Sequence, residues 1–354
     1  MNKDIEYKPI LIKSKVDVKK LLNEKPQVSL VDALSMQLKE LFFIDNKEFI
    51  GQDKEEVYKT KEFSKYIDNK KNKYNYFYYP WNNSLVKCIN SNDFFTLKTN
   101  RNKDLINKVD QKKLYNYRVA VFGMSVGSNI AFTITQAGIS REIIIADFDK
   151  LDTTNMNRIQ AGIHQIGMDK VIIATRRIYE ENPYMEVTLL SEGVSESNLE
   201  LLLENKKIDC IVEEVDDIKI KIQTRILAMK YKIPVLMITD NGDGVVLHIE
   251  RYDLGYNKIF EQDIIYWQEK IKNKFSIQDA GDIIINNIVG GVDKVDPEMI
   301  ASVQKVFKKE LVSWSQLGSA AILGGVVTTV AIKEILKGKN RDFYIRKYFN
   351  ISII

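Results

Sequence analysis

The chain has 354 residues, of which 45% are hydrophobic and 28% charged, and its formal net charge is +4. This length and apolar content predict about two domains with full cores, and only two cysteines exclude a disulfide scaffold and favour a reducing, cytoplasmic environment. The N-terminal MNKDIEYKP lacks the apolar core of a signal peptide, so no targeting segment is predicted.

Residues 1–110 predict a smaller α+β N-terminal domain, interpreted as an accessory or substrate-recognition region. The run SLVDALSMQLKELFF, residues 29–43, has apolar residues near helical spacing from Leu30 to Leu41 and predicts a helix. The aromatic run YNYFYYPW favours a half-buried strand over a ligand platform. Residues 1–116 contain 23 lysines and arginines against 16 acidic residues, but the charges are interleaved, which favours a solvated surface over a nucleic-acid-binding patch.

Residues 111–250 predict an α/β fold, a doubly wound Rossmann-like sheet that is mostly parallel. Its expected strands are VAVFG, EIIIAD, EVTLL, CIVEE and PVLMIT, which alternate with helical segments. Residues 251–354 are expected to form a C-terminal part with a polar loop around Trp267 and residues 279–282. The apolar run at residues 317–332 is too short for a membrane span and is broken by Gly, Ser and Thr, so a buried helix is predicted and no membrane segment.

The first of these strands runs directly into a glycine–serine turn. Gly123, Ser125, Gly127 and Ser128 are the predicted phosphate-binding residues, because glycines let backbone N–H groups approach a phosphate at a helix N-terminus. Asp147 ends the second strand twenty residues after Gly127, where a carboxylate can accept a hydrogen bond from a ribose hydroxyl. The alternative for Asp147 is an ordinary turn-capping acid.

Polar and charged residues follow the second and fourth strands. Asn155, Asn157, Arg158 and Lys170 suit a triphosphate, because Arg and Lys neutralise phosphoryl charge. Asp149, two residues after Asp147, is also a predicted cofactor-binding residue. Asn155 has the alternative of capping a helix. Asp216, within EEVDD, follows the fourth strand and is the predicted Mg²⁺ ligand, with the adjacent acid Asp217 as the alternative. The parts together predict handling of ATP and Mg²⁺.

The D-x-D…N-x-x-R run, with the downstream lysine and aspartate, resembles the ThiF/MoeB/ubiquitin-activating superfamily of adenylyltransferases. The resemblance implies a homodimer in which residues 111–354 form the adenylation domain and Arg101, in TNRN, contacts ATP phosphates of the other subunit. It implies adenylation of a carboxylate on a peptide, a small protein or a small acid. Nucleic acid would be a substrate only as a modified tRNA.

Three departures from the superfamily pattern refine this expectation. The glycine turn is one residue shorter, and Ser125 replaces a glycine, where a Cβ restricts positive φ. The CxxC pairs of the family's structural zinc site are missing, so no zinc is expected. Cys88 and Cys210 both lie in expected strands, Cys210 within the apolar run KIDCIV, so adenylation without an enzyme thioester is expected.

Alternatives and finer resemblances remain. The phrasing of YYPW, GMSVGS and ADFDKLDTTNMNR resembles a bacterial branch related to ThiF–nitroreductase fusions, which implies a separate nitroreductase-like partner. A non-catalytic nucleotide-binding subunit would usually have lost the Arg, Lys or metal Asp. An NAD(P)- or FAD-binding oxidoreductase would need a hydride-transfer site. Residues 240–243, DNGD, fit a ligand site at a strand end and a turn equally well, and His164 and His248 are expected to be structural.

Overall fold

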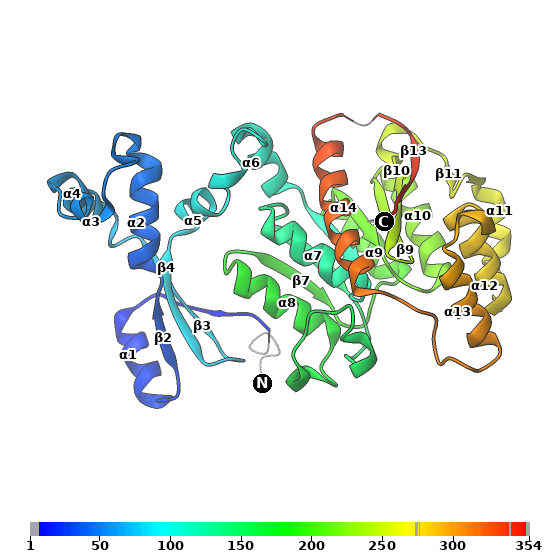
Figure 1. Ribbon diagram of the computed structural model, residues 1–354, viewed down its shortest axis with the longest axis horizontal. Coiled ribbons are helices and arrows are strands. Elements are labelled where there is room, and N and C mark those ends of the chain that lie inside the picture. Colours follow the sequence, from blue (N-terminus) through cyan, green and yellow to red (C-terminus); the bar gives the residue numbers. More distant parts are fainter. Residues whose placement is uncertain (1–6, 273–274, 276, 340, 352–354) are drawn as a thin grey trace. The chain divides into compact units, whose positions relative to one another are not determined.

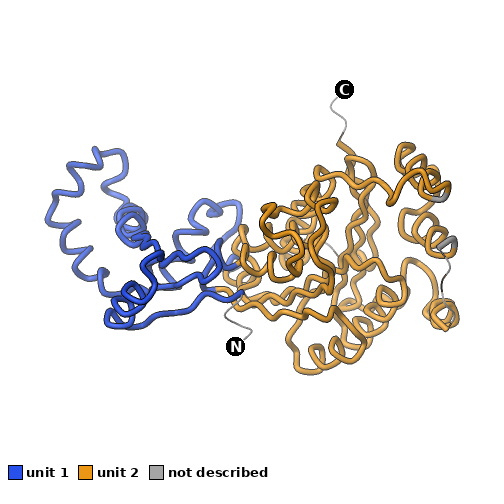
Figure 2. The backbone as a smooth tube through the Cα atoms, turned by 90° about the horizontal axis from the view of Figure 1, so that it is seen from below, with its two compact units in different colours: residues 1–111, 179–184 blue, residues 112–178, 185–354 orange. Residues whose placement is uncertain are grey.

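The computed structural model describes residues 7–272, 275, 277–339 and 341–351. The chain forms two compact units (Figure 2). Unit 1 contains residues 1–111 and 179–184, and unit 2 contains residues 112–178 and 185–354.

Unit 1 is built around a four-stranded mixed sheet of order β1-β3-β4-β2. The β1, β3 and β4 strands are antiparallel neighbours, and β2 pairs in parallel with β4. The strands are β1 (Ile10–Ile12), β2 (Ser29–Asp32), β3 (Tyr74–Tyr79) and β4 (Ser84–Ile89), and the helices are α1 (Lys15–Glu24), α2 (Leu34–Asp45), α3 (Lys54–Val57), α4 (Lys61–Lys70) and α5 (Ser91–Lys98). The strand predicted for the aromatic run is present as β3, with one half of its length buried.

The helix predicted for residues 29–43 begins later than expected. Residues Ser29–Asp32 form β2, and the Leu30 side chain is 50% exposed. The helix α2 begins at Leu34 and buries Leu34, Leu38 and Leu41 on one face. The prediction was wrong for the first residues because a short edge strand precedes the helix without a break in apolar content, and its pairing with β4 is not local in sequence.

The segment 179–184 belongs to unit 1 through side-chain hydrogen bonds. The hydroxyl of Tyr184 accepts from Asn75 Nδ2 at 3.0 Å and donates to the carbonyl of Ile89. The indole Nε1 of Trp81 donates to Glu180 at 2.6 Å. This segment continues from helix α8 (Lys170–Glu181), so one helix contributes residues to both units.

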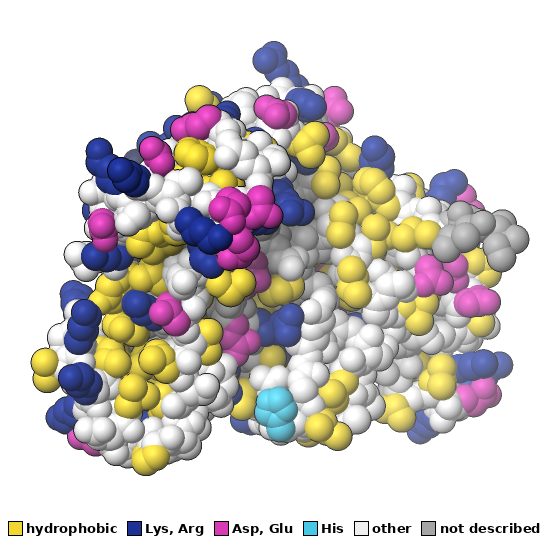
Figure 3. Space-filling view, turned by 60° about the vertical axis from the view of Figure 1, so that its left-hand side comes forward, with side chains coloured by type: hydrophobic (Ala, Val, Ile, Leu, Met, Phe, Trp, Pro, Cys, Tyr) yellow, Lys and Arg dark blue, Asp and Glu magenta, His cyan; other side chains and the backbone are white. Residues whose placement is uncertain are grey.

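Positive and negative charges are mixed on the face of the molecule that Figure 3 shows. Lysine and arginine side chains stand among acidic and apolar ones rather than in one extended basic area. This distribution agrees with the interleaved charges of the sequence.

Unit 2 is built around a seven-stranded sheet of order β13-β10-β9-β8-β5-β6-β7 (Figure 1). The five strands from β9 to β7 are parallel neighbours, whereas β10 pairs antiparallel with both β9 and β13. They are β5 (Val119–Phe122), β6 (Glu142–Ala146), β7 (Glu186–Leu190), β8 (Cys210–Glu213), β9 (Val235–Asn241), β10 (Gly244–Glu250) and β13 (Tyr344–Phe349). The predicted α/β class with a mostly parallel, Rossmann-like sheet is confirmed.

Helices cover both faces of this sheet. The strand β5 is therefore buried along its whole length, which its continuously apolar sequence suits. Ala120 and Phe122 join a core cluster with Leu199 of α9 (Glu196–Glu204) and Leu227 of α10 (Ile218–Tyr231). On the opposite face, Val121 lies against α7 (Val126–Gln136), where a side chain at Gly127 would meet it at 3.0 Å. Helix α14 (Gly318–Leu336) packs against α7, β9 and β10.

The C-terminal part is more regular than predicted. The strands β10 and β13 were not expected, and Trp267, expected in a polar loop, is fully buried in α11 (Ile264–Lys270). Residues 279–282 lie in α12 (Ile277–Ile283). The other elements are α6 (Lys108–Asn116), α13 (Pro297–Phe307), the short strands β11 (Lys258–Ile259) and β12 (Gln262–Asp263), the π-helix η7 (Ile284–Val289), and the 3₁₀ turns η2 (Lys47–Phe49), η3 (Asn100–Asn102), η4 (Thr153–Asn155), η5 (Ile163–Gln165), η6 (Tyr252–Leu254) and η8 (Val292–Lys294).

Within the described ranges, α14 is the one helix long and apolar enough to cross a membrane. Its mean hydropathy is 1.6, and 56% of the apolar window is buried inside the structure, as core helices often are. The helix predicted here is present, but it is buried on one side only: Ile322, Val326 and Val330, four residues apart, are 42–52% exposed.

Candidate functional site

The glycine turn after β5 depends on the backbone conformation of Gly123. Its φ is +85°, and its N–H donates to the carbonyl of Ala146 at 2.8 Å. A Cβ at this position would collide with the carbonyl oxygen of Glu214. Glycine is therefore required here both by conformation and by space.

The serine at position 125 does not require a positive φ. Ser125 is the N-cap residue of α7 with φ −78°, outside the left-handed region where a Cβ is unfavourable. The restriction expected for this position does not arise. The hydroxyl of Ser128 donates to the carbonyl of Ser125 at 2.9 Å, which closes the first turn of the helix.

Asp147 links the end of β6 to the glycine turn. One carboxylate oxygen accepts from the amide of Met124 at 2.5 Å, and the other accepts from the amide of Asp149 at 2.7 Å. Burial raises the pKa of Asp147, and the two backbone hydrogen bonds oppose this rise. The carboxylate is thus fixed in position, and each oxygen retains lone pairs for a further donor.

Arg158 lies beside the same turn. Its Nε donates to Ser125 Oγ at 2.9 Å, and its NH1 donates to Asn157 Oδ1 at 3.0 Å and to the carbonyl of Thr154 at 3.3 Å. Burial lowers the pKa of Arg158, while the negative charges of Asp240 and Asp216 act in the opposite direction.

Lys170 begins helix α8 and forms an ion pair with Asp149. The Nζ lies 2.7 Å from the Asp149 carboxylate; the lysine side chain is 8% exposed and the aspartate side chain 52%. The backbone N–H of Lys170 also donates to the carbonyl of Asp149 at 2.9 Å. The two predicted site residues are therefore in contact.

Asn155 acts as a local cap in this structure. Its Oδ1 accepts from the amide of Asp152 at 3.1 Å, within a capping box at the 3₁₀ turn η4. The capping role is the alternative that the sequence left open for this residue.

The acidic run EEVDD, residues 213–217, begins at the last residue of β8. Among the described residues, three of its acids have structural partners and one acid has none. Asp217 is the N-cap of α10 and accepts from the amides of Lys219 at 2.7 Å and Ile220 at 3.1 Å. Asp216 is exposed, and no hydrogen bond or ion pair occupies its carboxylate among the residues that the structure describes. Asp216 is therefore the acid that remains available to a ligand.

Glu213 and Glu214, the first two acids of this run, are committed to the core. Glu213 contacts Lys221 at 3.0 Å and Arg225 at 2.6 Å, and Arg225 also contacts Glu250 at 2.6 Å. Glu214 accepts from the amide of Ile238 at 2.8 Å. These contacts tie β8 to α10, β9 and β10, and so fix the strand end from which Asp216 extends.

Asp240 was weighed in the sequence but not included in the predicted site. It is the second-last residue of β9, before the turn at Gly242, and both of its oxygens are buried without a hydrogen-bond partner in the described part of the chain. Burial raises the pKa of Asp240 to about 6; the positive charge of Arg158 opposes the rise and the negative charge of Asp216 adds to it. An acid at the carboxyl end of a parallel strand was the available signal.

The predicted residues of unit 2 come from adjacent strand ends, whereas Arg101 belongs to unit 1. Gly123, Asp147 and Asp216 follow β5, β6 and β8, which are neighbours in the sheet. Arg101 is an exposed residue of the 3₁₀ turn η3.

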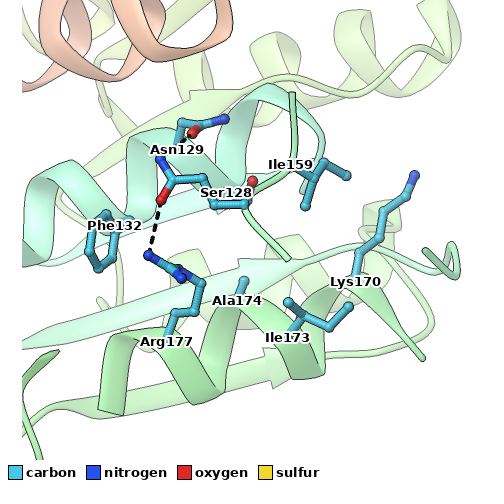
Figure 4. A pocket seen from close by; sticks show the side chains of 9 residues that line it. Ser128, Asn129, Phe132, Ile159, Lys170, Ile173, Ala174 and Arg177 are labelled. Atoms are coloured by element: carbon cyan, nitrogen blue, oxygen red, sulfur yellow. Dashed lines mark hydrogen bonds between the residues drawn. The ribbon is translucent and has the colours of Figure 1, made fainter. Parts of the chain in front are cut away.

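A small pocket lies between α7 and α8, beside the glycine turn that follows β5 (Figure 4). Ser128 and Phe132 line it from α7, and Lys170 and Arg177 line it from α8. Arg177 donates to Gln160 Oε1 at 3.0 Å, and its guanidinium lies 4.6 Å from the centre of the Phe132 ring. These contacts close the space between the two helices away from the strand ends.

Residues 97–343 match the model of the ThiF family. The chain is 37% identical over 177 residues to an uncharacterized protein of Mycobacterium tuberculosis, covering 50% of this chain and 24% of that protein. It is 33% identical over 138 residues to tRNA threonylcarbamoyladenosine dehydratase of Bacillus subtilis, covering 38% and 54%. It is 32% identical over 98 residues to ubiquitin-like modifier-activating enzyme 5 of Mus musculus, covering 27% and 24%. The chain thus spans between about a quarter and about half of the length of these relatives.

Solved structures share the fold. The E. coli tRNA threonylcarbamoyladenosine dehydratase in complex with AMP superposes with a TM-score of 0.51 and 17% sequence identity, covering 70% of this chain and 97% of that one. The same protein in complex with ATP gives a TM-score of 0.51 and 17% identity, covering 70% and 96%.

Proposed function

Because the chain belongs to the ThiF family, we propose that it is an ATP-dependent adenylyltransferase that activates a carboxylate. ATP and Mg²⁺ would be its cofactors, and an acyl-adenylate and pyrophosphate its products. Two relatives have names that suit this proposal: one is a tRNA threonylcarbamoyladenosine dehydratase, and the other is a ubiquitin-like modifier-activating enzyme.

One observation supports this proposal most directly: the predicted ribose acid and the predicted phosphate arginine are both bonded to the glycine turn. Asp147 accepts from Met124, and Arg158 donates to Ser125. A nucleotide whose phosphates follow the turn would therefore meet a carboxylate at its ribose end and a guanidinium at its phosphate end. Lys170, paired with Asp149, would supply a second cation.

The residues present suit a magnesium ion. Mg²⁺ is usually held by one or two carboxylates together with substrate phosphates, and Asp216 has a carboxylate without a partner among the described residues. Asp216 would hold the ion, which when bound supplies positive charge against the triphosphate.

In the proposed reaction, a substrate carboxylate oxygen attacks the α-phosphorus of ATP. A new oxygen–phosphorus bond forms, and the bond to the β-phosphate breaks to release pyrophosphate. Arg158 and Lys170 neutralise the charge that develops on the phosphates, and the turn at Gly123 orients them, so positioning and charge stabilisation carry the catalysis. In a homodimer, Arg101 of the second subunit would add a further cation.

The two cysteines support adenylation without an enzyme thioester. Cys88 and Cys210 are both buried and free. Burial raises the pKa of both thiols, Cys210 more strongly. A thioester requires an accessible thiolate, and neither residue offers one.

The substrate class in this proposal is a carboxylate on a peptide, a small protein or a small acid, including an acid carried on a modified tRNA. A separate nitroreductase-like protein is the proposed partner, and a homodimer is the proposed assembly.

The test has two stages. Calorimetry first compares ATP with NAD⁺ and FAD; binding of ATP in preference to both is expected, and preference for a dinucleotide would support the oxidoreductase alternative instead. Exchange of labelled pyrophosphate into ATP is then measured with peptides, small proteins and small acids as candidate carboxylates.

Three variants make the exchange assay specific. Arg158→Ala and Asp216→Ala are expected to abolish exchange while unfolding at the temperature of the unaltered protein, and a non-catalytic subunit would show no exchange in any variant. Lys230→Ala is the matched control, because Lys230 is exposed and forms a surface ion pair with Glu200. Exchange that survives in both site variants would refute the assignment.

A further inference from the structure

Asp240 is half-buried as a residue, and both of its carboxylate oxygens are buried. Neither oxygen has a hydrogen-bond partner among the described residues; the Gln316 amide interacts with the carboxyl group without completing a hydrogen bond of normal geometry. An unpaired buried carboxylate is unfavourable, and native proteins keep few such groups. A ligand that supplies the missing partner is the simplest reason to retain one.

The turn beside Asp240 does not need this side chain. The neighbouring Asn241 fills the structural role: its Nδ2 donates to the carbonyl of Lys294 at 3.0 Å, and its Oδ1 accepts from the amide of Asp296 at 2.7 Å. The reversal of the chain is made by Gly242, with φ +65°. Asp240 is thus distinguished from Asn241 by the absence of such bonds in the described chain.

Asp240 and Asp216 extend from neighbouring strand ends. The strands β8 and β9 are parallel, with Ile211 opposite Val235 and Val212 opposite Leu236, so their carboxyl ends meet at one edge of the sheet. The two carboxylates interact repulsively, and both interact with the positive charge of Arg158.

Arg158 does not neutralise these carboxylates by direct contact. Its guanidinium is bonded to Ser125, Asn157 and Thr154, and no ion pair joins it to either acid within the described residues. Two carboxylates without hydrogen-bonded partners among the described residues therefore interact electrostatically with a guanidinium that is held at the glycine turn. A small divalent cation would satisfy both acids and leave Arg158 to the phosphates.

We propose that Asp240 is a second carboxylate ligand, with Asp216, for the divalent cation that accompanies the phosphates of ATP. The inference rests on the proposed function, because phosphate oxygens and water supply the remaining ligands. One or two carboxylates with phosphates is the set that Mg²⁺ usually takes. The buried carboxylate would fix the cation on the protein, and the exposed one would close the site.

The test measures how much Mg²⁺ increases the affinity of the protein for ATP. Calorimetry gives the Kd of ATP in EDTA and in excess Mg²⁺, and the ratio of the two defines the coupling. The unaltered protein is expected to bind ATP at least tenfold more tightly with Mg²⁺. Asp240→Asn and Asp216→Asn should each reduce the coupling to threefold or less and leave the Kd in EDTA unchanged or lower, because a negative charge near the triphosphate is removed.

Electron paramagnetic resonance of Mn²⁺ provides a readout independent of ATP affinity. In the presence of ATP, one tightly bound Mn²⁺ is expected for the unaltered protein, and at least tenfold weaker Mn²⁺ binding for Asp240→Asn. The matched control is Asp243→Asn, because this acid lies in the same turn and already accepts a hydrogen bond from Ser319. Its coupling should equal that of the unaltered protein.

The outcomes separate the inference from the proposed function. No ATP binding by the unaltered protein, with or without Mg²⁺, would refute the proposed function and this inference together. ATP binding with wild-type coupling in Asp240→Asn would refute the inference alone, and so would ATP binding that never depends on Mg²⁺. Asp240→Ala serves as a second variant if the amide side chain disturbs folding.

Discussion

The guanidinium of Arg158 is held at the glycine turn by one hydrogen bond, in which its Nε donates to the hydroxyl of Ser125 at 2.9 Å. Ser125→Ala removes this bond and is expected to weaken ATP binding about fivefold, since such a bond contributes about 1 kcal/mol. Calorimetric titration with ATP measures the change. A double-mutant cycle supplies the control: in an Arg158→Ala background, Ser125→Ala should have no further effect, and an undiminished effect there would show that the hydroxyl acts independently of the arginine.

The second prediction concerns Lys170, which is expected to exchange its contact with Asp149 for a phosphate. Lys170→Ala should lower pyrophosphate exchange by about 100-fold, the size of effect typical for losing one electrostatic contact to a transition state. The control is Lys150→Ala, because Lys150 also pairs with an aspartate, Asp169, but is 67% exposed. Equal losses of exchange in the two variants would indicate a general charge effect rather than a site contact.

The third prediction separates backbone strain from collision in the glycine turn. Gly123 and Gly167 have nearly equal φ values of +85° and +83°, but only a side chain at Gly123 would meet neighbouring atoms. Gly167→Ala should reduce the free energy of unfolding by about 1 kcal/mol from conformation alone. Gly123→Ala should lose about 3 kcal/mol or more, because the carbonyl of Glu214 must also move. Chemical denaturation measures both, and similar losses would contradict the collision.

The fourth prediction is a pH dependence of stability that originates at His248. This residue is fully buried on β10 beside Tyr344, and burial with nearby Arg346 and Arg225 lowers its pKa well below 6.5. The unfolded chain therefore binds a proton below pH 6.5 that the folded protein does not, so stability falls as pH decreases from 6.5.

The slope from this single group approaches about 1.4 kcal/mol per pH unit. His248→Gln removes the titrating ring, and the difference between the variant and the unaltered protein isolates it from other acids. Denaturant unfolding at pH 8, 6 and 5 should show a smaller loss of stability for the variant at the two lower values. Parallel losses would mean that His248 takes up a proton equally in the folded and unfolded states, so that its pKa is not lowered by folding.

The sequence predicts the parallel part of the large sheet well because each strand is a short apolar run that ends in glycine or polar residues. The strand β13 was missed because it pairs with β10 from about a hundred residues away, which local pattern does not report. The strand β10 pairs with β9 across the turn at residues 240–243, a local signal that the sequence left open between a turn and a ligand site. The edge strand at Ser29–Asp32 was absorbed into a helix for a similar reason.

The candidate site, like the fold, is only partly predictable from the sequence. Spacing predicts Gly123, Asp147 and Arg158 as site residues because the turn, the strand end and the loop that carry them follow one another closely in the chain. The availability of Asp216 and the isolation of Asp240 depend on which neighbouring acids the fold uses: Asp217 caps α10 and Glu213 pairs with Arg225. Sequence pattern names the acids of such a cluster, and packing decides which remain free.

Helix α8 carries the predicted phosphate lysine at its first residue, and its last residues belong to unit 1 with Tyr184. A single cut between the units therefore cannot yield two whole folding modules. A fragment that ends at residue 111 would lack the tyrosine that binds Asn75 and Ile89, and a fragment that begins at residue 112 would carry that tyrosine with no partner. Separate expression of the units would therefore require residues 179–184 to be transferred to the fragment that carries the rest of unit 1.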